Sequence, residues 1–88
     1  MYRIQWRRAV SRKLLAASAK AESTPLTDIM TAISKVESLL HDEPEFVGEL
    51  RDAEERLLIV EPISVIYKID YRKRVVHVLR AKVRRTNS

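Results

Sequence analysis

The residues best suited to chemistry in this sequence are cations close to its C-terminal end. Residues 75–83 are rich in β-branched side chains and are predicted to form a strand. Because successive side chains of a strand point to opposite faces, Arg80, Lys82 and Arg84 should form a row on one face, about 7 Å apart. That spacing suits the phosphates of an extended nucleic acid, and a guanidinium can donate two hydrogen bonds to one phosphate. The alternative is a solvated edge strand whose charges prevent aggregation.

Other kinds of site find little support in the sequence. His41 is expected at the end of a helix, where a cation complements the helix dipole. His77 is expected at the edge of the core, and Trp6 is expected within the core. No His, Asp or Glu residues have the spacing of a metal site, and one glycine cannot make a phosphate-binding loop. No Ser/His/Asp arrangement is recognisable.

If the protein is an enzyme, its tools are therefore cationic. Arginine and lysine can position a phosphodiester and stabilise the charge that develops during cleavage. The 2′-hydroxyl of RNA would then be the nucleophile, so this chemistry needs neither a metal nor a cofactor.

Charge is segregated along the chain. Residues 1–21 hold six basic and no acidic side chains, residues 22–61 hold three basic and eleven acidic, and residues 62–88 hold eight basic and one acidic. Two basic ends around an acidic middle indicate a polyanion-facing surface. Internal salt bridges and solubility are the competing explanation.

Length and composition limit the class of protein. The 88 residues suffice for one domain with one small core, so we expect a single domain over residues 1–88 with a polar tail at 84–88. The absence of cysteine suits a reducing cytoplasm. We expect no signal peptide, no membrane span and no membrane partner, since every long stretch is interrupted by charge.

The periodicity of apolar residues predicts the order β-α-α-β-β-β. Alternation predicts a strand at residues 2–6, and three- and four-residue spacing predicts helices at 7–21 and 25–40. Residues 44–55 should form a loop with, at most, a short helical turn. Strands are predicted at 56–60, 63–70 and 75–83, with a charged turn at 71–74. We therefore predict an α+β fold in which a helix hairpin packs on one face of a small, mainly antiparallel sheet.

Strict alternation also sorts the last strand into two faces. One set should face the helices: Val75, His77, Leu79, Ala81 and Val83. The other should face outward: Val76, Val78, Arg80, Lys82 and Arg84.

Taken in order, these segments resemble the RelE/ParE superfamily of bacterial toxins. The resemblance rests on Tyr2-x-Ile4-x-Trp6, on Pro44 and Gly48-Glu49-Leu50-Arg51, on the arginine-led strand 56–60 and the strand with Val65-Ile66-Tyr67, and on Arg74 to Leu79 with Arg84-Arg85. It covers almost the whole chain.

The resemblance implies the toxin of a bacterial type II toxin–antitoxin pair, neutralised by a cognate antitoxin. A RelE-like member would cleave mRNA in the ribosome as an mRNA interferase, with Arg56, Arg84 and Arg85 as catalytic residues. Arg80, Lys82, Lys68, Arg7 and Arg8 would contact nucleic acid. No small-molecule cofactor is implied.

A non-enzymatic role is the alternative. Ser64 stands where RelE-like nucleases often carry an arginine, and the tail after Arg85 has no Tyr or His. These departures favour a ParE-like inhibitor of DNA gyrase, or a toxin-fold protein that only binds an antitoxin.

Overall fold

The computed structural model describes residues 1–20 and 26–84. The helices in this part of the chain are α1 (Arg8–Lys20), α2 (Leu26–Asp42) and α3 (Pro44–Val47). The strands are β1 (Arg3–Trp6), β2 (Glu49–Leu50), β3 (Arg56–Val60), β4 (Ile63–Asp70) and β5 (Val75–Val83). These five strands form one sheet in the order β1-β5-β4-β3-β2.

The connections determine how the strands pair. Short turns join β3 to β4 and β4 to β5, so both pairs are antiparallel. β1 pairs with β5 in parallel, which needs the long crossover that the helices and the other strands supply. The predicted α+β architecture with a mainly antiparallel sheet is therefore confirmed.

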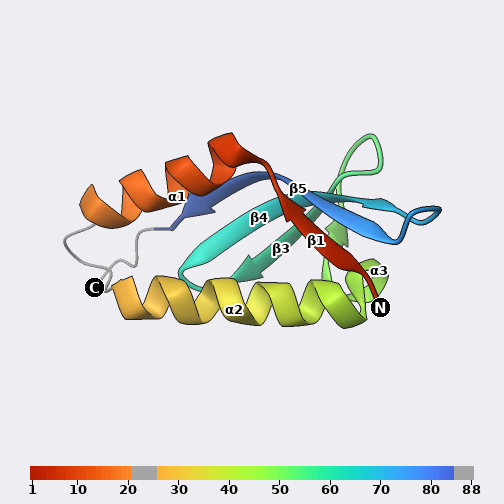
Figure 1. Cartoon of the computed structure of the whole chain (residues 1–88), viewed down its shortest axis with the longest axis horizontal. Coiled ribbons are helices and arrows are strands. Elements are labelled where there is room, and N and C mark those ends of the chain that lie inside the picture. Colours follow the sequence, from red (N-terminus) through yellow and green to blue (C-terminus); the bar gives the residue numbers. More distant parts are fainter. Residues whose placement is uncertain (21–25, 85–88) are drawn as a thin grey trace.

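The core forms between the sheet and α2. Ile29, Ala32, Val36 and Leu40 recur at three- and four-residue spacing and are buried, so they form the apolar stripe of α2. Figure 1 shows α2 running along the length of the sheet. None of the described helices is long and apolar enough to cross a membrane.

α1 continues the chain where β1 ends and lies alongside the C-terminal half of β5 (Figure 1). The Arg7 N–H donates to the carbonyl of Val78 at 3.3 Å, which marks the point where strand pairing gives way to the helix. Val10 and Leu14 are buried on this side of α1. The two helices run in opposite directions, as predicted, while the connection at 21–25 lies outside the described residues.

A β-bulge in β5 corrects the predicted sorting of its side chains. Ile66 pairs with Arg80 but Tyr67 pairs with Val78, so Leu79 is an extra residue without a partner on β4. The alternation of β5 side chains between the two faces of the sheet therefore reverses at Leu79.

The prediction was wrong for the first half of β5 and right for the second. Val76 and Val78 are fully buried in the core cluster, whereas Val75, which is also buried, and His77 lie on the opposite face of the strand. Leu79 lines a hollow at the surface. Ala81 and Val83 pack against the core as predicted, and Arg80 and Lys82 face away from it.

The segment 44–55, predicted as a loop with at most a short helical turn, forms the short helix α3 and also the short strand β2. α3 begins at the buried Pro44, and the Tyr67 hydroxyl donates a hydrogen bond to the Pro44 carbonyl at 2.5 Å. The two-residue strand β2 then pairs with Arg56 and Leu57. These contacts fasten α3 to the core side of β4.

Candidate nucleic-acid interface

The predicted row of cations lies on the sheet face opposite α2, here called the open face. Arg80 and Lys82 are exposed on β5 and stand opposite Ile66 and Ser64 of β4. Arg84 follows the end of the strand and is also exposed. Its N–H donates to the carbonyl of Pro62, so the backbone that carries the third cation is held against the β3–β4 turn.

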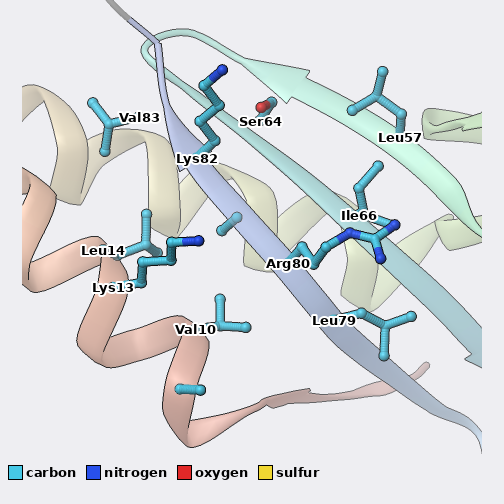
Figure 2. Close-up of a pocket in the computed structure, with 12 residues that line it drawn as sticks. Val10, Lys13, Leu14, Leu57, Ser64, Ile66, Leu79, Arg80, Lys82 and Val83 are labelled. Carbon is cyan, nitrogen blue, oxygen red and sulfur yellow. The ribbon is translucent and has the colours of Figure 1, made fainter.

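A hollow of about 640 Å³ lies beside this row, between α1 and strands β3, β4 and β5. Its apolar lining is supplied by Val10, Leu14, Leu57, Ile66, Leu79 and Val83. Lys13, Arg80 and Lys82 add three cations, and Figure 2 shows Lys13 reaching from α1 toward β5. An apolar surface bordered by positive charge can accept a ligand that is both apolar and anionic.

Two residues of the row are engaged by carboxylates. Arg80 Nη2 lies 2.6 Å from Glu55 Oε1, and Arg84 Nη1 lies 2.9 Å from Glu61 Oε1. The side chains of Arg80 and Arg84 remain 65% and 45% exposed, so water and salt screen both pairs. Such pairs contribute about 0.2–1 kcal/mol each, and a phosphate can displace the carboxylate.

Lys82 lies between the two paired arginines. It has no acidic partner among residues 1–20 and 26–84. An anion approaching the row therefore meets one unpaired ammonium flanked by two guanidinium groups that are already oriented.

Arg56 lies apart from this row. It pairs with Tyr67, whose side chain belongs to the core, and therefore sits on the face opposite Arg80. Its Nη1 donates to the carbonyls of Glu45 at 3.1 Å and Gly48 at 3.5 Å. In this position the guanidinium joins α3 to β3, and the structure does not bring it together with the other predicted catalytic residues.

The remaining predicted contacts are spread over the surface. Lys68 is exposed on the open face opposite His77, while Arg7 and Arg8 are exposed where β1 passes into α1. Arg85 lies outside the described residues. His41 occupies the last turn of α2, where the dipole argument placed it, and its Nδ1 lies 3.0 Å from Asp42 Oδ1. Trp6 packs against the core.

Two kinds of residue at the interface were not predicted from the sequence. Lys13 follows Ala9 by one helical turn, so helical spacing alone could have placed it beside the apolar stripe of α1. Glu55 and Glu61 lie 25 and 23 residues from their arginines, and no local pattern links positions so far apart. Among the described residues, no three His, Asp or Glu side chains gather to hold a metal.

Burial perturbs one phenol strongly, on the core side of the sheet. Burial raises the pKa of Tyr67 to about 12, an effect partly offset by the nearby Arg56 charge. This phenol therefore stays protonated at neutral pH and donates to Pro44. Through this hydrogen bond the hydroxyl holds α3 against β4.

Comparison with solved structures identifies the fold. A chain of the toxin–antitoxin complex RelBE2 from Mycobacterium tuberculosis matches with a TM-score of 0.73 at 23% identity, over 94% of this chain and 98% of that chain. The isolated RelE toxin of E. coli matches with a TM-score of 0.69 at 12% identity, over 99% and 88%. The archaeal RelE–RelB complex from Pyrococcus horikoshii matches with 0.66 at 18% identity, over 94% of each chain. No protein-family model and no curated protein matches the chain.

The chain therefore has the fold of the RelE toxins. This confirms, at the level of fold, the resemblance that the sequence motifs indicated. The matches span both proteins almost end to end, so the shared unit is the whole domain.

Proposed function

We propose that this chain is the toxin of a bacterial type II toxin–antitoxin pair that acts in the cytoplasm and inhibits translation through contact of its open face with RNA. The observation that carries the proposal is the row Arg80, Lys82 and Arg84, exposed on a RelE fold. The matched structures include an isolated RelE toxin and complexes of such toxins with antitoxins. A polyanion is the ligand that a row of cations at strand spacing recognises.

In the enzymatic form of the proposal, the chain is an mRNA interferase. Arg80 and Lys82 position the phosphodiester, and Arg84 and Arg85 stabilise the charge that develops as the RNA 2′-hydroxyl attacks the adjacent phosphorus. The bond between phosphorus and the 5′-oxygen of the next nucleotide breaks, and the proton lost by the 2′-hydroxyl reaches that 5′-oxygen through solvent. The products are a 2′,3′-cyclic phosphate and a free 5′-hydroxyl. Arg56 has no part in this scheme, since its hydrogen bonds lie on the other face.

A non-enzymatic role is the second candidate. The open face offers no arginine at Ser64, and Glu55 and Glu61 occupy two of the three cations of the row. These observations favour a protein that binds an antitoxin without cleaving RNA, or one that inhibits DNA gyrase.

The proposed antitoxin partner fits the hollow beside α1. Its apolar lining and its three cations suit a partner segment that carries both apolar and acidic side chains. Such a segment would cover Arg80 and Lys82 and so block access of RNA to them.

Expression in bacteria without an antitoxin tests the proposal. Growth should stop, and mapping of RNA 5′ ends should reveal new cleavage within translated mRNA. An Arg80→Ala/Lys82→Ala variant should restore growth, whereas Lys35→Ala, an exposed cation on α2, should not.

The outcomes separate the candidates. Arrest without RNA cleavage supports the non-enzymatic candidate, and relaxed plasmid supercoiling or gyrase-linked DNA breaks would identify gyrase as the target. Normal growth with the protein expressed and folded refutes a toxin role.

A further inference from the structure

A second group of cations surrounds the turn between β4 and β5, at the opposite end of β5 from the row. Arg72, Lys73 and Arg74 are exposed in the turn, and Arg3 is exposed on β1 beside it. No ion pair joins any of these four to an acidic side chain within residues 1–20 and 26–84. In this respect the turn differs from the row, where carboxylates engage two of the three cations.

The turn holds its cations in a defined arrangement. The Lys73 N–H donates to Asp70 Oδ1 at 3.0 Å, and the Arg3 N–H donates to the Arg74 carbonyl at 2.9 Å. The Arg74 guanidinium lies 5.7 Å from the centre of the Tyr2 ring, within the range of a cation–π contact. Because the backbone of the turn is fixed, less conformational entropy is lost when a ligand orders its side chains.

Arg74 occupies a backbone conformation that arginine does not favour. Its φ is 54°, in the left-handed region where glycine and asparagine are the usual residues. A non-glycine residue there costs roughly 1 kcal/mol. Arginine therefore stands at a position where the backbone conformation alone would favour glycine.

An aromatic ring stands beside these cations. Tyr71 is the first residue of the turn and is 58% exposed, so its face is available to a partner. Cations with an exposed aromatic ring suit nucleic acid, since phosphates pair with the charges and a base can stack on the ring.

The open face links the turn to the row. Lys68 lies on that face opposite His77, between the turn and Arg80. Arg74 directly precedes β5, and five residues of the strand lie between it and Arg80, so the two are six steps or about 20 Å apart along the chain. A single polyanion can therefore follow β5 from one group to the other.

We propose that the β4–β5 turn is a second RNA-binding site that holds the phosphate backbone of structured RNA without reading its sequence. The contact is made by Arg72, Lys73 and Arg74, with Tyr71 stacking on an exposed base. The inference rests on the proposed action on RNA and adds to it an anchoring site distinct from the row. Binding at the turn places the RNA along β5 and presents it to Arg80 and Lys82.

The test is the salt dependence of RNA binding by the full chain. Fluorescence anisotropy would measure the affinity for a labelled 20-base-pair RNA hairpin from 50 to 300 mM KCl. Each phosphate contact contributes roughly 0.7–0.9 to the slope of log K against log salt. The Arg72→Gln/Lys73→Gln variant should lower the slope by about 1–2 and weaken binding roughly 10-fold at 100 mM salt.

Two further variants make the result specific. Lys35→Gln/Arg51→Gln removes the same amount of charge from exposed positions outside both groups, and should change the slope much less. Arg74→Gly relieves the left-handed backbone strain but also removes the cation–π contact with Tyr2, so the melting temperature should change little while RNA binding still weakens.

Comparison with an Arg80→Gln/Lys82→Gln variant separates this inference from the proposed function. If only the row variant loses affinity, the turn is not an RNA site, although the proposed function stands. If neither variant differs from the control, or if the unmodified chain binds no RNA, both ideas fail. A loss confined to phosphatidylglycerol vesicles, with RNA binding unchanged, also overturns the inference.

Discussion

Replacing Gly48 with alanine should destabilise the protein through a steric conflict. The backbone at Gly48 has φ −108° and ψ 153°, an extended conformation that any residue adopts. Alanine would therefore stabilise the fold slightly, by about 0.4–1 kcal/mol, if the backbone alone mattered. However, a Cβ at this position would collide with the Tyr67 hydroxyl and lie 2.8 Å from its Cε1 and Cζ.

The magnitude follows from what Tyr67 must give up. The ring is fully buried, so it can move only by overpacking the core, at about 1–3 kcal/mol. Moving it also breaks the hydrogen bond from its hydroxyl to Pro44, and leaving buried polar groups unpaired costs about 1–3 kcal/mol. When the stabilisation of about 0.4–1 kcal/mol from the backbone is subtracted from these two costs, we expect Gly48→Ala to lower the free energy of unfolding by about 2–4 kcal/mol.

Urea denaturation and thermal melting would measure this change. A domain of this size loses about 4–8 °C in melting temperature per kcal/mol, so a drop of roughly 8–32 °C is expected. In a Tyr67→Phe background the hydroxyl is absent, and the penalty for Gly48→Ala should shrink by at least about 1 kcal/mol. A Gly48→Ala protein as stable as the unmodified chain, or equal penalties in both backgrounds, would refute the steric argument.

Three further predictions concern the described side chains. Glu55→Gln should strengthen RNA binding more than Glu54→Gln does, because only Glu55 competes with phosphate for Arg80; equal effects would mean that charge alone is responsible. Arg56→Gln should lower the free energy of unfolding by about 1–3 kcal/mol, because the Arg56 guanidinium donates hydrogen bonds to backbone carbonyls. It should change RNA affinity no more than removing a charge far from the row does. A large loss of affinity measured by anisotropy would contradict this. Burial raises the pKa of Tyr67 to about 12 in the folded state, so the contribution of this phenol to stability is complete below pH 10 and is lost between pH 10 and 12. The difference in free energy of unfolding between the unmodified chain and Tyr67→Phe should therefore shrink over that range. A constant difference would show that this phenol does not titrate there.

The secondary structure could be predicted largely from the sequence because each element carries its own periodicity. Ile29, Val36 and Leu40 recur at helical spacing, and their burial against the sheet follows from that spacing. The short strand β2 could not be predicted. Two residues carry no period, and they form a strand only because Arg56 and Leu57 lie beside them.

The face of each β5 side chain depended on tertiary structure. Val75, Val76, Val78 and Leu79 are all apolar, so the sequence suits either alternation. The bulge at Leu79 selects between them, and it belongs to the pairing of β5 with β4, not to β5 alone. Because of this extra residue, His77 lies on the open face and not on the core face that strict alternation predicted. Arg80 lies on the face that strict alternation predicted.

The arginines of this chain have different roles because their surroundings in the fold differ. The sequence by itself determined that cations gather at both ends of the chain and that Arg80 and Lys82 share a face, since charge and strand spacing are local properties. Only the tertiary structure decided that Arg56 joins α3 to β3 and that Glu55 and Glu61 pair with the row. Those contacts join residues distant in the sequence, and the folded arrangement of the strands alone brings them within hydrogen-bonding distance.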